Sequence, residues 1–241
     1  MSALAGAGVP IPHGDGYPVL IIDDHELFST TLTMALRNEG FDARTLPIAD
    51  VRDFLDRPVT HPTGPVVLDL DLDRDADGRY VNGADLVEGL RRAGWKVLVV
   101  SGSMDQPGTA SAIASGAIGS VPKSHSFATL LGTVVMAAGG TPVMSEIEHW
   151  EWLERHRQYQ EQERELSRRL ARLSYREREV LELLATGMRA AAIAEHFVVS
   201  LPTVRTQIRS LLTKLEVNSQ LEAVALLRQL PAPVDRSRRD G

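Results

Sequence analysis

The sequence has 241 residues and no cysteine, which excludes disulfide bonds, thiolate metal sites and cysteine nucleophiles. It also lacks any apolar run of the roughly 18–20 residues that a membrane-spanning helix needs. Residues 1–16 contain no Lys or Arg, so they do not resemble a signal peptide, and their Gly, Ala and Pro content predicts a disordered arm. We therefore expect a cytoplasmic protein without a membrane segment. A second disordered segment is expected at residues 231–241.

The net charge of −6 is unevenly distributed along the chain. Residues 15–145 contain 17 acidic and 10 basic side chains, whereas residues 168–230 contain 6 acidic and 10 basic ones. The length suggests two modest domains. An acidic first region and a basic second region favour a nucleic-acid-binding domain at the C-terminal end.

Short apolar runs alternate with amphipathic stretches between residues 17 and 140. The predicted strands are 19–22, 43–46, 66–68, 97–100 and 118–121, and the predicted helices are 27–38, 49–56, 84–93, 106–115 and 127–138. This alternation predicts an α/β domain with a doubly wound, parallel, five-stranded sheet. Sites in such sheets lie beyond the carboxyl ends of the strands.

Residues 146–173 are highly charged and nearly free of Gly and Pro, which predicts a long connecting helix. Trp152, Tyr159, Leu166 and Leu173 are spaced seven residues apart, in an imperfect heptad pattern. Two interpretations stay open. The helix is either a linker that packs its aromatic residues on the first domain, or a coiled coil in which Trp152, Tyr159 and Leu166 face a second copy.

Residues 174–230 contain signals for four short helices. Ser174 and Glu177 form a capping-box pattern at the start of the first of them. Ser200 is placed to cap the third helix, with Pro202 in its first turn, and Ser219 is placed to cap the fourth. These signals predict a small all-α domain.

Polar residues follow the predicted strands where their carboxyl ends should converge. Asp23 and Asp24 follow the first strand, Asp69 the third, Ser101 the fourth and Lys123 the fifth. Clustered carboxylates favour a hard cation such as Mg²⁺. A carboxylate beside such an ion can attack a phosphoryl group, while the hydroxyl and the ammonium stabilise the phosphoryl oxygens.

Four segments carry a resemblance to the receiver domain of bacterial response regulators, over Tyr17 to about Ala138. They are V-L-I-I-D-D, V-V-L-D-L-D-L, V-L-V-V-S-G-S and G-A-I-G-S-V-P-K. The resemblance implies that Asp23, Asp24 and Asp69 bind Mg²⁺. It also implies that Asp69 is the phosphoacceptor, Ser101 the switch hydroxyl and Lys123 the phosphate-binding cation.

Asp71 is a rival for the phosphoacceptor. Asp69 is preferred because Asp69-Leu70-Asp71-Leu72 fits the aspartate–hydrophobic–any–Met/Leu run of the family. The chain departs from the family pattern where Asp73-Arg74 replaces Met-Pro, and where Ser120 stands at the aromatic switch position. A receiver that signals without phosphorylation therefore stays open.

The sequence disfavours two other kinds of site. The acidic run that begins at Asp73 starts like a calcium loop, but Ala84 stands where a bidentate Glu is needed. A phosphohydrolase of the haloacid-dehalogenase type would carry its last acidic pair after the lysine, whereas here Asp23 and Asp24 precede it. His25 and His125 are predicted to be surface residues.

The C-terminal region resembles the LuxR-type helix-turn-helix, so the whole chain is similar to NarL/FixJ-type response regulators. The matching segments are L-S-Y-R-E-R-E-V-L-E-L-L-A-T-G, I-A-E-H-F-V-V-S, T-V-R-T-Q-I-R and K-L-E-V-N-S. Arg205, Thr206 and Arg209 share the polar side of the third helix, from which they can contact base edges. Contacts to DNA phosphates are assigned to Thr203, Gln207, Ser210 and Lys214.

The resemblance also implies partners. We expect promoter DNA, a sensor histidine kinase and a second copy of the chain, which would use Leu221, Val224 and Arg228 of the fourth helix. The expected function is that of a transcription regulator rather than a turnover enzyme. The alternatives are a regulator controlled by a ligand or by dimerisation, and, remotely, a phosphohydrolase.

Overall fold

The computed structural model describes residues 16–56, 64–74, 80–102 and 107–229. The arm and tail expected at residues 1–16 and 231–241 lie outside these residues, apart from Gly16. The chain forms two compact units, with the boundary between Arg157 and Gln158, and each unit is described by itself.

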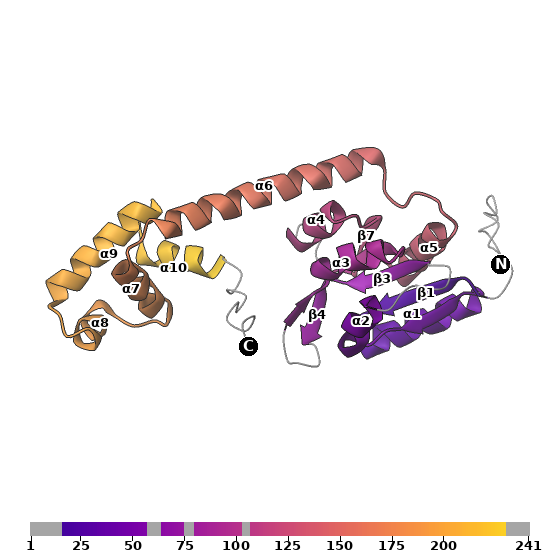
Figure 1. The fold of residues 1–241 in the computed structure, drawn as a ribbon, viewed down its shortest axis with the longest axis horizontal. Helices are drawn as coiled ribbons and strands as arrows, with labels where there is room; N and C mark the ends of the chain where they lie inside the picture. The colour runs from indigo at the N-terminus through magenta and orange to yellow at the C-terminus, as the bar shows by residue number, and fades with distance from the viewer. Residues whose placement is uncertain (1–15, 57–63, 75–79, 103–106, 230–241) are drawn as a thin grey trace. The chain divides into compact units, whose positions relative to one another are not determined.

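A parallel five-stranded sheet forms the centre of the first unit (Figure 1). Its strands are β1 (Pro18–Ile22), β2 (Asp42–Thr45), β3 (Pro65–Asp69), β6 (Lys96–Ser101) and β7 (Gly119–Pro122). They are ordered β2-β1-β3-β6-β7, with Ile21 opposite Val67 and Leu68 opposite Val99. The predicted doubly wound sheet is confirmed. All five residues of β3 are buried, in keeping with a strand covered on both faces.

The helices of this unit are α1 (Glu26–Asn38), α2 (Ile48–Leu55), α3 (Gly83–Arg92), α4 (Pro107–Ala114) and α5 (Phe127–Ala138). On one face of the sheet, Leu32 and Leu36 of α1 and Val134 of α5 pack against alternate strand residues such as Ile21 and Val67. Gly40 follows α1 with φ +90°, a conformation that L-residues with a side chain rarely adopt.

A two-stranded antiparallel sheet was not predicted. It consists of β4 (Asp71–Arg74) and β5 (Tyr80–Asn82), in a region where we expected an acidic loop. Residues 75–79, which include part of the calcium-like run, lie outside the described residues. A Cβ atom on Gly83 would lie 2.1 Å from the Asp69 carbonyl oxygen, so a glycine is required where α3 begins against the end of β3.

The second unit is helical. Its helices are α7 (Tyr175–Ala185), α8 (Ala190–His196), α9 (Leu201–Leu215) and α10 (Gln220–Gln229), and α6 (Glu146–Ala171) leads into it. The predicted capping box is present: Glu177 N–H donates to Ser174 Oγ at 3.3 Å, and Ser174 N–H donates to Glu177 Oε2 at 2.7 Å.

The last turns of α6 belong to the core of the second unit. Leu166, Leu170 and Leu173 are buried against residues of α7 and α9, including Leu181 and Leu211. This contradicts the prediction that Leu166 faces a second chain. The spacing of seven arises because these leucines lie on one side of a helix that packs within its own chain.

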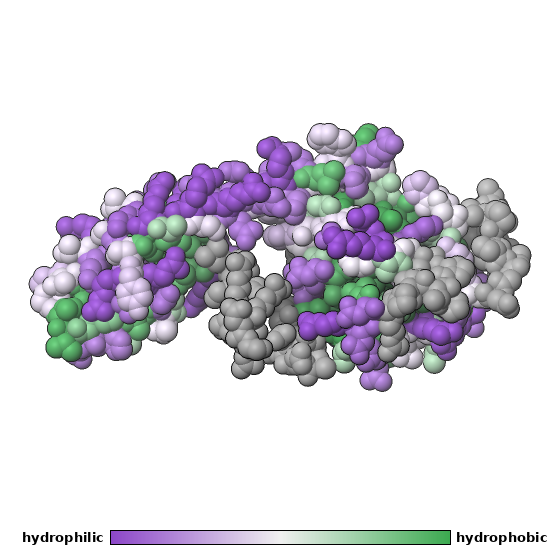
Figure 2. All heavy atoms as spheres, in the orientation of Figure 1, coloured by the Kyte–Doolittle hydropathy of each residue, from purple (hydrophilic) through white to green (hydrophobic). Residues whose placement is uncertain are grey.

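The remaining part of α6 is strongly polar on the face seen in Figure 2. Trp152 is nonetheless buried, and its ring lies 4.8 Å from the Arg155 guanidinium. Tyr159 is partly buried. Its role in a dimer stays a prediction. None of the helices in the described part of the chain is both long and apolar enough to span a membrane.

Candidate functional site

The carboxyl edge of the sheet brings together the predicted polar residues. Asp69 ends β3, Ser101 ends β6, and Asp23 and Lys123 directly follow β1 and β7. Lys123 Nζ donates to Asp69 Oδ2 at 2.5 Å and lies 3.2 Å from Asp23 Oδ2. Lys123 and Asp69 are 54 positions apart in the sequence. They lie together because the parallel topology brings the carboxyl ends of the strands to one edge.

Asp69 is fully buried, and its charge is only partly compensated. Burial raises the pKa of the Asp69 carboxyl, and the nearby charge of Asp23 adds to this rise, while the hydrogen bond from Lys123 opposes it. Burial disfavours the charge on Lys123 as well, but its hydrogen bond to Asp69 and the negative charges of Asp69 and Asp23 outweigh this effect and raise the pKa of Lys123. The second Asp69 oxygen accepts a long hydrogen bond of 3.3 Å from the Asp71 amide.

The acidic pair after β1 offers oxygen ligands for a cation. Asp23 is 8% exposed, and its Oδ2 forms no hydrogen bond within the described residues, although it lies near Lys123. Asp23, Asp24, His25 and Asp69 each offer one ligand atom, and these atoms lie within 4.8 Å of one another. Clustered carboxylate oxygens are the ligands that hard divalent cations prefer. The residues present therefore fit a divalent metal.

His25 belongs to this cluster, which the sequence did not reveal. Its side chain is 65% exposed, in keeping with the expected surface position, but Nδ1 lies 2.7 Å from Asp24 Oδ1 and 3.9 Å from Asp69 Oδ2. Its backbone N–H also donates to Asp23 Oδ1 at 2.7 Å. Its position directly after two acidic residues was the only available signal.

Two hydroxyl groups lie at the end of β6. Ser101 is fully buried, and its Oγ lies 3.4 Å from Thr109 Oγ1 of α4, a residue that sequence reasoning missed. Asp71, the rival phosphoacceptor, is exposed and begins β4. The structure places Asp69, rather than Asp71, in contact with Lys123.

The second unit presents α9 as a helix with one apolar and one basic side. Val204 and Ile208 are buried in the core of the unit. Arg205, Thr206 and Arg209 are exposed, and neither arginine forms an ion pair within the described part of the chain. Because side chains four apart share a helix face, the two arginines project together.

Four residues of α9 were expected to contact phosphates, and the structure separates them. Ser210 Oγ and Lys214 Nζ each donate to Glu177 of α7, both at 2.6 Å. These two polar groups are therefore engaged within the unit, and their contact with DNA phosphates stays a prediction. Thr203 is exposed beside Ser200, whereas Gln207 is partly buried and its Oε1 has no hydrogen-bond partner among the described residues.

The residues expected to form a dimer face on α10 are also divided. Leu221 is 80% exposed. Val224 packs against the core of its own unit, and Arg228 donates to the Ala185 carbonyl at 3.1 Å. Leu221 and Arg228 are exposed, whereas Val224 is partly buried.

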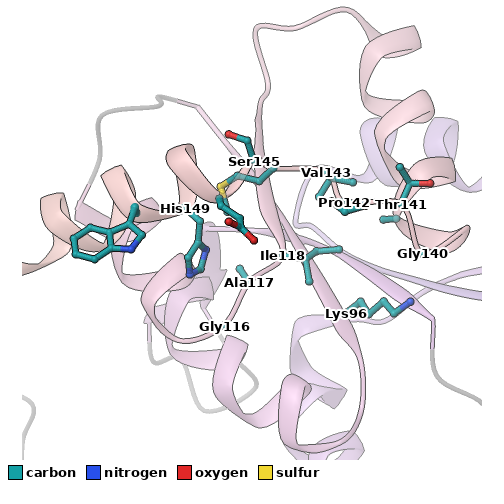
Figure 3. Close-up of a pocket in the computed structure, with 14 residues that line it drawn as sticks. Lys96, Gly116, Ala117, Ile118, Gly140, Thr141, Pro142, Val143, Ser145 and His149 are labelled. Carbon is teal, nitrogen blue, oxygen red and sulfur yellow. The ribbon is translucent and has the colours of Figure 1, made fainter.

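A hollow of about 720 Å³ lies at the opposite end of the sheet from Asp69. Figure 3 shows it bordered by the segment that contains Thr141, Pro142 and Val143, with His149 of α6 on one side and Lys96, the first residue of β6, on another. It contains none of the residues expected to bind metal, phosphate or DNA.

Family models match both units. Residues 19–135 match the response regulator receiver domain, and residues 171–227 match the bacterial regulatory proteins of the luxR family. The nitrate/nitrite response regulator protein homolog of Haemophilus influenzae is 30% identical over 216 residues, which cover 88% of this chain and 96% of that protein. The chain belongs to the two-component response regulators.

Other relatives of this response regulator span both units. The transcriptional regulatory protein FixJ of Azorhizobium caulinodans is 28% identical over 92% of the chain and 97% of that protein. NarP of Escherichia coli is 27% identical over 91% and 98%. A solved RcsB–DNA complex has 20% identity and a TM-score of 0.46, over 90% of this chain and 100% of that one.

Proposed function

We propose that this response regulator is a promoter-binding transcription regulator controlled by phosphorylation of Asp69. The observation that supports this most directly is the buried contact between Asp69 and Lys123 at the carboxyl edge of the sheet, with Asp23 Oδ2 3.2 Å from the same ammonium. The exposed Arg205 and Arg209 of the second unit supply the output surface.

The reaction is a phosphoryl transfer from a sensor histidine kinase. A carboxylate oxygen of Asp69 attacks the phosphorus of a phosphohistidine, an acyl phosphate bond forms, and the P–N bond breaks as the leaving imidazole nitrogen takes a proton. Asp23, Asp24 and Asp69 would hold Mg²⁺, which supplies charge neutralisation when bound. Lys123 and Ser101 bind the phosphoryl oxygens.

The donor cannot reach Asp69 without a rearrangement, because this side chain has no exposed surface. Lys123 is 25% exposed and lies at its carboxylate. We expect Lys123 to move from the carboxylate to the new phosphoryl group, which would give the receiver two states that differ at the sheet edge.

The phosphorylation proposal is tested with wild type, Asp69→Asn and Asp71→Asn, each treated with a small acyl phosphate and Mg²⁺. Intact mass should show one phosphoryl adduct in wild type and in Asp71→Asn, and none in Asp69→Asn. An adduct that persists in Asp69→Asn would refute the assignment. No adduct in wild type would favour a receiver that signals without phosphorylation.

The second part of the proposal concerns base reading by α9. An arginine can form two hydrogen bonds to guanine in the major groove, with roughly 1–3 kcal/mol of discrimination for each such contact. Arg205→Ala and Arg209→Ala should each relax base preference at one position when sites are selected from random DNA. Arg164→Ala, at an exposed position of α6, is the control and should leave the preference unchanged. If both α9 variants keep the wild-type preference, the sequence is read elsewhere, with Thr206 next to be tested.

We also propose that the regulator binds DNA as a homodimer, with Leu221 at the contact between two copies. An apolar side chain that is 80% exposed on the last helix supports this role. In sedimentation experiments with half-site DNA, Leu221→Glu should shift the phosphorylated protein from dimer toward monomer. Glu222→Gln on the same helix should leave the dimer unchanged. An unchanged dimer would place the interface elsewhere, with Tyr159 as the remaining candidate.

A further inference from the structure

The turn between α8 and α9 contains a valine in a backbone conformation that valine rarely adopts. Val198 has φ +56°, and its N–H donates to the Glu195 carbonyl at 3.1 Å. The Val199 N–H donates to the Ala194 carbonyl at 2.9 Å, which completes a Schellman motif at the end of α8. Glycine is the usual residue at the left-handed position of this motif because it has no Cβ atom. The turn therefore requires the left-handed conformation, but it does not require a valine.

The Val198 side chain is almost entirely exposed. Its exposed fraction is 91%, and within the described residues it is not part of the core against which its neighbour Val199 packs. Figure 2 shows apolar atoms on the surface at the lower left, over the turn between α8 and α9. A β-branched residue in the left-handed region costs free energy, and strained residues are concentrated where a ligand or partner binds. The fold of the unit thus gives no reason for a valine at this position.

The turn that carries Val198 is held on both sides. Phe197 ends α8, and the Arg176 guanidinium of α7 lies 3.4 Å from the centroid of its ring. After the turn, the Ser200 side chain accepts a hydrogen bond from the Thr203 amide at 3.2 Å and caps α9. The valine methyl groups are therefore presented at a defined place, as a residue that contacts a partner with geometric precision requires.

Val198 also lies near the residues expected to read bases. The N-terminal end of the recognition helix meets the base edges in helix-turn-helix proteins, and Val198 precedes the cap of α9 by two residues. Arg205 follows that cap by five residues, so its Cα atom is at most about 15 Å from that of Val198, or roughly four base-pair steps. A valine side chain has no hydrogen-bonding group. The group on a base edge that matches it is the C5 methyl of thymine.

We propose that Val198 reads the C5 methyl group of a thymine in the major groove, near the bases that the α9 arginines contact. The contact is apolar and complements the charged contacts of Arg205 and Arg209, which are exposed on α9. It accounts for an exposed apolar side chain where the turn itself favours glycine. The inference rests on DNA reading by α9 in the proposed function, but its test removes a single methyl group from the DNA.

The test uses a duplex that full-length wild type selects from random DNA. Each thymine is replaced in turn by uracil, which lacks only the C5 methyl group, and affinity is measured at one salt concentration. One uracil per half-site should weaken binding by wild type about fourfold, the effect of one methyl group lost from an apolar contact. The same uracil should not affect Val198→Asn, because asparagine tolerates the left-handed turn and lacks the methyl groups. Val198→Ile should keep the sensitivity to uracil.

Glu216→Asn is the matched control. Glu216 has φ +59° at the opposite end of α9, so this variant places the same residue in the same backbone conformation away from the turn, and it should respond to uracil as wild type does. If the uracil penalty persists in Val198→Asn, or if no thymine shows one in wild type, the inference is overturned while base reading by the arginines stands. A penalty that persists in Val198→Asn but disappears in Thr206→Ala would assign the methyl contact to Thr206. A wild type that selects no site would overturn both the inference and the DNA-reading part of the proposed function.

Discussion

In both units a buried carboxylate pairs with a lysine, Asp69 with Lys123 and Glu177 with Lys214, but the two carboxylates differ in how many hydrogen bonds they accept. Glu177 accepts hydrogen bonds from Lys214 at 2.6 Å, Ser210 at 2.6 Å and the Ser174 amide at 2.7 Å. These bonds outweigh burial and lower the pKa of Glu177 to about 2. The charged form is therefore the one that the fold stabilises.

Asp69 is in the reverse situation. It is more deeply buried, it shares its lysine with Asp23, and its other oxygen accepts only a long bond from an amide. Burial raises its pKa despite the lysine. The comparison shows that a buried lysine–carboxylate pair has no fixed contribution to stability, because the number of additional donors decides its sign. In the second unit the pair stabilises the fold. In the first unit the carboxylate has fewer hydrogen-bond donors and stays available for chemistry.

Glu177→Gln tests most directly whether the lysine–carboxylate pair stabilises the second unit. Removing the charge leaves Lys214 next to an amide and breaks bonds to a charged acceptor, so we expect a loss of roughly 2 kcal/mol in the unfolding free energy of the second unit. Hydrogen exchange of α7 and α9 amides in the full-length protein measures this loss without involving the first unit. Glu179→Gln is the matched control on α7, since Glu179 pairs with Arg176 at a partly exposed site and should change stability by less than about 0.5 kcal/mol.

The same pair predicts a pH dependence. The pKa of Glu177 falls from 4.5 to about 2 on folding, so its contribution is present above pH 4.5 and is lost as the pH falls toward 2. Protection of α9 amides should therefore decline over that window in wild type and decline less in Glu177→Gln. Equal declines in the two proteins would show that other groups cause the acid sensitivity.

The sequence predicted strands such as β3, which are buried apolar runs, and helices such as α5 and α9, which begin at a capping serine. Strands β4 and β5 were not predicted because β4 has the sequence D-L-D-R, which contains a single apolar residue. The leucines of the predicted heptad pattern pack in the core of their own chain. The spacing of leucines along a helix does not show which surface covers them.

The candidate site followed from topology, because parallel strands bring their carboxyl ends to one edge. Glu177 could not be assigned in the same way. Its capping box explained the carboxylate locally, and nothing marked the contacts to Ser210 and Lys214, which lie 33 and 37 positions away. Long-range contacts of this kind depend on helix packing and leave no short-range pattern.

A smaller effect of opposite sign is expected for Asp69→Asn. The amide removes a buried charge whose pKa the fold raises and relieves its repulsion with Asp23, so the melting temperature of the first unit should rise by a few degrees. The contribution of the carboxyl itself has the opposite pH sign to that of Glu177: it is present below pH 3.8 and is lost as the pH rises through the raised value. Asp71→Asn, at an exposed position, is the control and should leave the melting temperature nearly unchanged. A fall in Asp69→Asn would mean that the bond from Lys123 outweighs burial.

The second unit also contains a β-branched residue in an unfavourable backbone conformation, and its substitution gives the smallest expected effect. Val198 adopts φ +56° in the turn between α8 and α9 and is 91% exposed. A β-branched side chain is strained in the left-handed region, whereas asparagine tolerates it. Val198→Asn should therefore stabilise the second unit by about 1 kcal/mol, measured as greater protection of α9 amides from exchange. Gly187 adopts φ +88°, so Gly187→Ala should shift protection in the opposite direction. If Val198→Asn destabilises the unit, packing of the valine rather than backbone strain determines the energy of this turn. The second unit would then have no strained residue to compare with the unfavourably buried Asp69.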